Sequence, residues 1–106
     1  MVEGKWYPQG ADIAVPLRVR AAALDAGRDA LDDAAQQVVV FQGGQPVGTA
    51  RLWWADGGFQ AGDIGVLPAE RGKGYGDLLV RLLLYKAATH GARFLTLACP
   101  QGLAPF

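Results

Sequence analysis

The sequence is poor in cysteine, has no net charge and lacks a long apolar run, and each of these features excludes a class of protein. It has one cysteine among 106 residues, which excludes an internal disulfide framework and favours a reducing compartment. Ten basic and ten acidic residues give a formal net charge of zero, so no basic field favours nucleic acid as a partner. No apolar run approaches the ~20 residues that a membrane-spanning helix needs, so no membrane partner is expected.

The N-terminal sequence and the chain length further limit the class of protein to which the chain can belong. Residues Met1 to Gly4 lack the charged segment and apolar run of a signal peptide, so we expect a cytoplasmic protein. A length of 106 residues suits one domain over residues 1–106, and a hydrophobic content of 51% is enough for a packed core. Metal binding would need further ligands at close spacing, and the sequence has none, so no metal is expected.

Glycine is abundant, and it concentrates between an expected strand and a long apolar helix. Arg71, Gly74 and Gly76 form the pattern R-x-x-G-x-G, and Gly72 adds a third glycine. Glycine leaves the backbone N–H groups uncovered, and those at the start of a helix have no intrahelical partner. The helix dipole and the charges of Arg71 and Lys73 add positive potential there. The stretch therefore predicts an anion site suited to a phosphate or pyrophosphate.

Two other glycine-rich loops fail on spacing. A Walker A loop needs Ser or Thr after its lysine, but Lys73 is followed by Gly74. A dinucleotide fingerprint G-x-G-x-x-G that starts at Gly72 ends on Asp77, and one that starts at Gly74 ends on Leu79. An ordinary tight connection between a strand and a helix is the remaining alternative to an anion site.

The run from Val66 to Gly76 resembles the acetyl-CoA loop of the GCN5-related N-acetyltransferase (GNAT) superfamily. The resemblance extends upstream through Pro46–Leu52 and downstream through His90–Arg93 to the expected strand Phe94–Ala98. It covers roughly the last two thirds of the chain and, more weakly, the first third. It implies an α/β (α+β) fold, with a mixed, mostly antiparallel sheet and helices on both faces.

Turn residues and hydrophobic spacing predict the elements of this fold. A proline-free helix from Tyr75 to His90 and a parallel strand after it follow the glycine loop. Gly62 and Gly65 lie inside a strand, where glycine often marks a bulge or a close backbone approach. The other expected elements are strands Val2–Tyr7, Gln37–Gln42, Val47–Ala55, Phe59–Leu67 and Arg93–Cys99, a helix capped by Asp12 and running to Leu24, and a weaker helix Arg28–Ala35 whose Asp32 and Asp33 form a solvated face.

The last residues depart from the resembled family, which continues with a helix and a final hairpin. We interpret Ala104–Phe106 as the opening of that helix, and the fold as C-terminally truncated. The edge of the Phe94 strand is then uncovered, as is a second apolar stripe of Leu78, Leu82 and Tyr85 on the long helix. A homo-oligomer would cover both surfaces and is the expected assembly; a missing segment of the chain is the alternative.

The resemblance implies acetyl transfer from acetyl-CoA to a primary amine of a small molecule or a protein. The pyrophosphate would lie on the loop N–H groups, and the pantetheine arm would pair with the end of the preceding strand. A backbone N–H near Val66 would stabilise the thioester oxygen. The residues implied to bind the cofactor are Ile64, Val66, Leu67, Arg71, Gly72, Lys73, Gly74, Tyr75 and Gly76.

Direct attack needs an amine that has lost its proton, so a general base assists the reaction. Asp63 lies on the strand that leads into the loop, where the family often has its base; a solvent-facing charge is the alternative. Glu70 is interpreted as a surface residue, His90 as a helix-end residue and Cys99 as a small buried hydrophobe. The family's tyrosine acid would follow Phe106, so a non-catalytic acyl-CoA-binding module and a half-domain completed by oligomerisation stay open.

Overall fold

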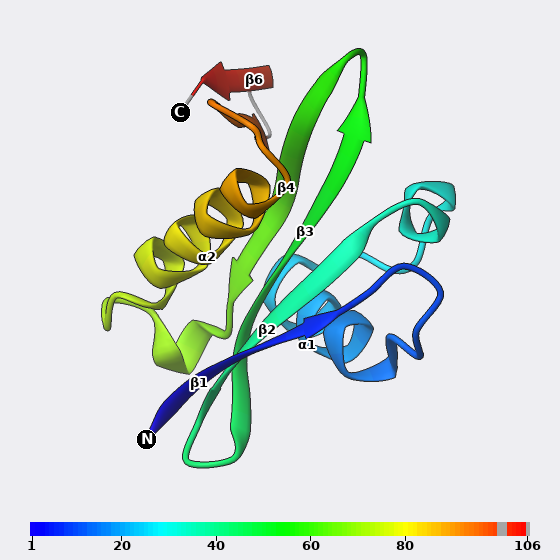
Figure 1. Ribbon diagram of the computed structural model, residues 1–106. Coiled ribbons are helices and arrows are strands. Elements are labelled where there is room, and N and C mark those ends of the chain that lie inside the picture. Colours follow the sequence, from blue (N-terminus) through cyan, green and yellow to red (C-terminus); the bar gives the residue numbers. More distant parts are fainter. Residues whose placement is uncertain (100–101, 106) are drawn as a thin grey trace.

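The structure is a computed structural model that describes residues 1–99 and 102–105, and side chains as far as Leu97. Among these residues, five strands form a mostly antiparallel sheet in chain order, and a sixth extends it beside β5 (Figure 1). The elements are β1 (Val2–Tyr7), α1 (Ala14–Leu24), the 3₁₀ helix η1 (Ala30–Asp33), β2 (Gln36–Gln42), β3 (Gln45–Ala55), β4 (Gly58–Val66), the 3₁₀ helix η2 (Pro68–Glu70), α2 (Tyr75–Thr89), β5 (Thr96–Cys99) and β6 (Gly102–Pro105).

Tight hairpins produce the antiparallel part of the sheet. Gly43 and Gly44 join β2 to β3 with φ values of 57° and 84°, a left-handed turn that glycine adopts without strain. Helix α2 then carries the chain from β4 to β5, and these two strands pair in parallel. A parallel pair needs such a crossover, so the predicted order of three antiparallel strands, loop, helix and parallel strand is confirmed.

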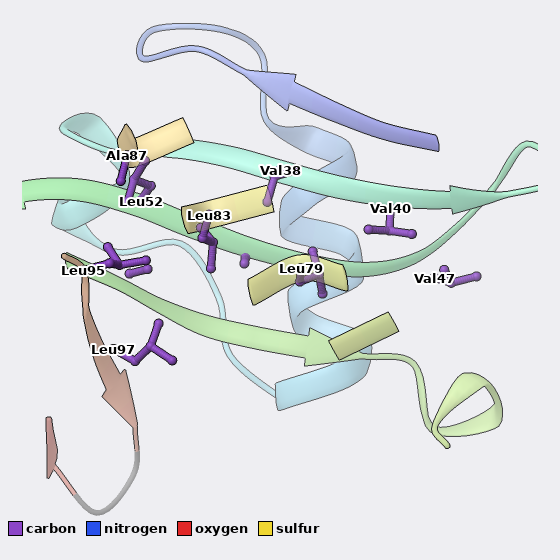
Figure 2. Packing of buried hydrophobic residues seen from close by; sticks show 11 residues of the cluster. Val38, Val40, Val47, Leu52, Leu79, Leu83, Ala87, Leu95 and Leu97 are labelled. Carbon is purple, nitrogen blue, oxygen red and sulfur yellow. The ribbon is translucent and has the colours of Figure 1, made fainter. Parts of the chain in front are cut away.

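Helix α2 packs an entirely apolar stripe against one face of the sheet. Leu79, Leu83 and Ala87 are buried at spacing i, i+4, i+8 and point at strand residues (Figure 2). The helical spacing of Val80, Leu83, Leu84 and Ala87 predicts a buried stripe, which is confirmed for Leu83 and Ala87, but the centre of the buried face is rotated toward Leu79. The strand and turn residues of this cluster are Val38, Val40, Val47, Ala50, Leu52, Ala61, Leu95 and Leu97.

Helix α1 covers the opposite face, so the expectation of helices on both faces is confirmed (Figure 1). A small apolar cluster of Tyr7, Ile13 and Val39 lies at one end of this face. Next to it, polar and charged side chains are buried: Arg20 of α1, Asp32 of η1, and three strand residues, Gln37, Thr49 and Arg51. The α1 face is therefore held in large part by hydrogen bonds and ion pairs.

The segment predicted as a helix over Arg28–Ala35 is helical only in η1. Asp33 is exposed and pairs with Arg28, but Asp32 is only 4% exposed. The prediction that both carboxylates face solvent is therefore wrong for Asp32. The reason is a partner far away in sequence, since Asp32 forms a salt bridge of 2.8 Å with the buried Arg20.

The end of the chain also differs from the prediction. Gly102–Pro105 forms β6, antiparallel to β5, so the interpretation of Ala104 and Pro105 as the opening of a helix is wrong. Phe106 lies outside the described residues. β5 begins at Thr96, after Phe94, and β6 pairs with it on the side away from β4. The unpaired groups of β5 find partners in β6, so the strand edge expected to be free is covered.

The second apolar stripe of α2 is covered as well. Leu82 packs so closely on Gly4 of β1 that a Cβ atom there would lie 2.8 Å from its Cδ1. Leu78 packs against the apolar cluster, whereas Tyr85 is 72% exposed. The prediction of an uncovered stripe is therefore wrong for Leu82, which lies on β1, and for Leu78, which packs against the cluster under α2. The homo-oligomer stays a prediction without this support.

Candidate functional site

Strand β4 loses one of its two partners halfway along. Gln60 and Ala61 lie opposite residues 96 and 97 of β5, and in the described residues these are the pairs that join the two strands. From Gly62 to Val66, β4 is paired on the β3 side. Its other edge is open there, and an extended, amide-bearing ligand can bind such an edge as an added strand.

Hydrogen bonds at the end of β4 show which backbone groups face this open edge. The Leu67 N–H donates to the Val47 carbonyl of β3 at 2.9 Å. Because pairing groups alternate along an antiparallel strand, the N–H and carbonyl of Val66 face the other way. The Val66 carbonyl accepts a hydrogen bond from Arg71 Nε at 3.2 Å. The Val66 N–H is therefore the group left for a ligand.

The glycine loop follows directly and has a bare backbone. Gly72 and Gly74 have φ values of 81° and 88°, in the left-handed region that side chains disfavour. A Cβ atom built on Gly72, Gly74 or Gly76 would meet nothing within 4 Å, so the space above the loop is open. The first hydrogen bond of α2 runs from the Leu78 N–H to the Gly74 carbonyl, 3.1 Å away. The N–H groups before Leu78 are not part of the hydrogen-bond ladder of the helix, so an anion can bind them.

The two basic side chains of the loop have partners inside the protein. Arg71 Nη2 donates to the Ala23 carbonyl in the last turn of α1 at 3.2 Å. Lys73 Nζ lies 2.9 Å from Glu70, and this hydrogen bond raises the pKa of Lys73. Arg71 therefore ties the base of the loop to the opposite face of the sheet. The predicted role of both charges toward an anion stays a prediction.

Asp63 lies in a bulge where β4 turns away from β5. Arg51 is opposite Gly62 and Thr49 is opposite Gly65, so two residues of β4 face one residue of β3. The two glycines thus flank a bulge, as the sequence predicted. Asp63 has a φ of 49°, which is left-handed, and its carboxylate pairs with the Arg51 guanidinium. The side chain is 35% exposed, so solvent and small molecules reach it.

Arg51 is a residue that the sequence interpretation did not single out. Its Nη1 and Nη2 donate to the two oxygens of Asp29 at 2.7 and 2.9 Å, and Nη1 also donates to Asp32 at 3.1 Å. Hydrogen bonds from Arg51 lower the pKa of Asp29. With Asp63, three carboxylates from η1, its N-cap and β4 meet on one guanidinium of β3. An arginine among the apolar residues of a predicted strand was the available signal.

Asp32 anchors the inner side of this network. Burial alone would raise its pKa, but hydrogen bonds from Arg20 and from the Asp29 N–H, with the charges of both arginines, hold the pKa well below the ordinary range. Arg20 donates to both oxygens at 2.8 and 2.9 Å, and the Gln37 side-chain amide donates at 2.9 Å. Asp32 is thus a satisfied structural carboxylate, unlike Asp63, which is half-open.

The remaining candidates lie apart from this site. His90 ends α2 and its ring lies 5.6 Å from that of Phe59, while the Cys99 side chain lies outside the described residues. Trp53 is buried and Trp54 exposed, because adjacent residues of a strand point to opposite faces of the sheet. In the described ranges, no three histidine, cysteine or carboxylate side chains gather as a metal site. No helix there is long and apolar enough to cross a membrane.

Three solved structures share this architecture. An IAA acetyltransferase from Bacillus cereus superposes with a TM-score of 0.79 at 23% identity, over 92% of this chain and 65% of that one. A GNAT family acetyltransferase from Elizabethkingia anophelis with acetyl-CoA bound gives 0.73 at 15% identity, over 91% and 63%. One from Brucella melitensis in complex with acetyl-CoA gives 0.73 at 23% identity, over 93% and 76%. The chain thus spans less than two thirds of the first two, and the likeness establishes the fold.

The comparison of sequences identifies the family, which the likeness of fold alone does not. No curated protein matches the chain in sequence. The sequence profile of the Acetyltransferase (GNAT) family, in contrast, matches residues 6–103, which include the end of β1, strands β2 to β5, both α-helices and the glycine loop. The bare loop at the start of α2 and the open edge of β4 lie inside this match. By this match over nearly its whole length, the chain belongs to the GNAT family of acetyltransferases.

Proposed function

We propose that the chain binds acetyl-CoA along the open edge of β4 and on the glycine loop, and transfers the acetyl group to a primary amine of a small molecule or a protein. One observation carries the proposal: the open edge from Gly62 to Val66 is followed, after the single turn η2, by N–H groups of glycines with open space around them. A pantetheine arm carries amides that suit the edge, and a pyrophosphate suits the start of a helix. Two structural relatives contain acetyl-CoA.

In the proposed reaction, the amine nitrogen attacks the thioester carbonyl carbon, the C–S bond breaks, and CoA leaves as its thiolate. Asp63 takes the proton of the attacking amine, directly or through a water molecule. The N–H of Val66 donates to the carbonyl oxygen as negative charge develops on it. The bulge supports this assignment, because it lies between the paired part of β4 and its open edge.

The cofactor site is tested by Gly74→Glu, which covers the loop and brings a negative charge to a phosphate site. We expect acetyl-CoA affinity, measured by calorimetry, to fall by ~100-fold or more, since most of the anion contact is lost. Gly57→Glu is the matched control: Gly57 also has a positive φ of 77° and open space around it, but lies in the β3–β4 turn. Unchanged affinity in Gly74→Glu would overturn the proposed site.

The transfer itself is tested by following CoA release across a panel of amines. Asp63→Asn should lower kcat while leaving acetyl-CoA affinity unchanged, because the base acts only after the cofactor is bound. An unchanged rate would return Asp63 to the role of a surface charge. Acetyl-CoA binding without release of CoA from any amine would instead identify a non-catalytic acyl-CoA-binding module, the alternative that the sequence left open.

A further inference from the structure

The guanidinium of Arg51 is held in one orientation from several sides. Asp29 accepts hydrogen bonds from both of its terminal nitrogens, and Asp32 accepts one from Nη1. The ring of Trp53 lies 5.6 Å from the guanidinium carbon. The contacts with the two carboxylates and the Trp53 ring leave the Arg51 side chain little rotational freedom. Because the guanidinium is a planar fork, the direction in which Nη2 points is then specific. That nitrogen meets the carboxylate of Asp63.

Asp63, in contrast, is in a conformation that needs support. A left-handed φ at a residue other than glycine costs on the order of 1 kcal/mol and persists only where surrounding contacts determine it. The Asp63 side chain has 35% exposure, and the Arg51 side chain has 7%, so their ion pair joins an accessible carboxylate to a buried cation. The bulge that carries Asp63 is also the point at which β4 separates from β5.

We propose that Arg51 is a positioning residue for the acetyl transfer: anchored by Asp29 and Asp32, it fixes the carboxylate of Asp63 and the β4 bulge beside the open edge. Arg51 itself does not touch the substrate, because it is buried behind the carboxylates. The inference rests on the proposed function, since it gives Asp63 a defined orientation toward the amine. It extends that function to the η1 turn, which contributes the two anchoring carboxylates although it lies outside β4 and the loop.

Arg51→Lys is the central experiment, because lysine keeps the charge but cannot bind Asp29 and Asp63 as a planar fork. We expect kcat to fall by ~10-fold while acetyl-CoA affinity changes by less than ~2-fold, because the cofactor contacts are separate from the arginine. Asp29→Asn weakens the anchor from the exposed side and should lower kcat in the same direction by a smaller factor. This second variant keeps the proposal testable if Arg51→Lys does not fold.

A double-mutant cycle separates positioning from a general loss of structure. If Arg51 acts through Asp63, then Arg51→Lys should lower kcat by less than ~2-fold in the Asp63→Asn background, because the group that it orients is already lost. Arg28→Lys is the matched control. Arg28 also pairs with a carboxylate of η1, Asp33 at 2.7 Å, but the pair is exposed and none of the hydrogen bonds of the described residues joins it to Arg51 or Asp63, so kcat should not change.

The outcomes distinguish this inference from the function on which it rests. No CoA release by the unmodified chain would overturn the proposed transfer and the positioning role together. With an active chain, an Arg51→Lys variant of lowered melting temperature but unchanged kcat would overturn the positioning role alone. The positioning role would also be overturned if the effects of Arg51→Lys and Asp63→Asn on kcat multiplied fully in the double mutant, because independent effects mean that Arg51 does not act through Asp63.

Discussion

The two faces of the sheet are built from different interactions. On the α2 face, every buried residue of the cluster is apolar, from Val38 in β2 to Leu83 in the helix. On the α1 face, two arginines, an aspartate and a glutamine are buried side by side. Apolar contacts are non-directional and scale with area, whereas ion pairs require defined geometry. The α2 face is therefore suited to provide stability, and the α1 face to fix the relative positions of η1, β3 and β4.

This contrast bears on where the proposed chemistry occurs. A buried ion network adds little net stability compared with an apolar core of the same shape, because its charges must be desolvated. Its presence next to the β4 bulge is better explained by the orientation that it imposes on Asp63. Breaking each face in turn should therefore have different consequences for stability and for turnover.

The largest effect is expected for Asp32→Asn on the α1 face. The variant keeps the shape of the side chain but leaves Arg20 and Arg51 without their shared buried counter-charge. We expect a loss of about 3–5 kcal/mol in the free energy of unfolding, the usual cost of breaking a buried pair by removing one partner. Urea denaturation measures it. A loss below about 1 kcal/mol would mean that the network is exposed in solution.

Leu83→Ala tests the apolar face. Leu83 is fully buried in the cluster under α2, so its truncation removes apolar contacts and leaves a cavity. We expect a loss of about 3 kcal/mol, and Leu83→Met, which keeps the volume, should cost less than about 1.5 kcal/mol. Equal losses in the two variants would contradict cavity formation as the cause. Acetyl-CoA affinity of the folded fraction should stay unchanged.

Acid should weaken the α1 face in particular. The pKa of Asp32 is lowered in the folded chain, so as pH falls the unfolded state binds the proton first. The stabilisation is therefore complete above the ordinary aspartate value of about 4 and is lost as pH falls below it, by at most about 1.4 kcal/mol per pH unit. Denaturation between pH 3 and pH 7 should give a steeper dependence for the unmodified chain than for Asp32→Asn.

The smallest effects distinguish two neighbours on α2. Leu82 packs on Gly4, so Leu82→Ala should cost about 1 kcal/mol, as expected for a half-buried leucine. Tyr85 is exposed, so Tyr85→Ala should change stability by less than about 0.5 kcal/mol. Light scattering on the same variants tests the predicted homo-oligomer. A dimer dissociated by the change at Tyr85 alone would identify that residue as part of an interface.

The parts of the fold that follow from local pattern were predictable from the sequence. The hairpins, the glycine loop and the long helix each have a short-range signal in turn residues or periodicity. Arg51 stands out in its strand, but no local pattern predicts its partners Asp32 and Asp29, because they are 19 and 22 residues away in the chain and only the fold brings them together. Asp32 was misjudged for the same reason. β6 was not expected, because the family resemblance implied the opening of a helix at Ala104–Phe106.

The site was predictable to a similar extent. The loop motif located the open N–H groups, and Gly62 and Gly65 indicated the bulge around Asp63. Chain order alone did not reveal the contacts that Arg71 makes, because they run to the Val66 carbonyl at the end of β4 and to the Ala23 carbonyl in α1. Side-chain direction depends on such long-range neighbours, and a motif does not specify them.

The bond from Arg71 to the Ala23 carbonyl has a consequence for motion as well as for geometry. α1 also touches β4 directly, since a Cβ atom on Gly65 would lie 2.9 Å from Ala23 Cβ. A ligand that orders the glycine loop therefore makes it harder for the last turn of α1 to open, by linkage between local unfolding and binding. Amide hydrogen exchange in that turn should slow when acetyl-CoA is added, which would make the far side of the sheet a reporter of the bound cofactor.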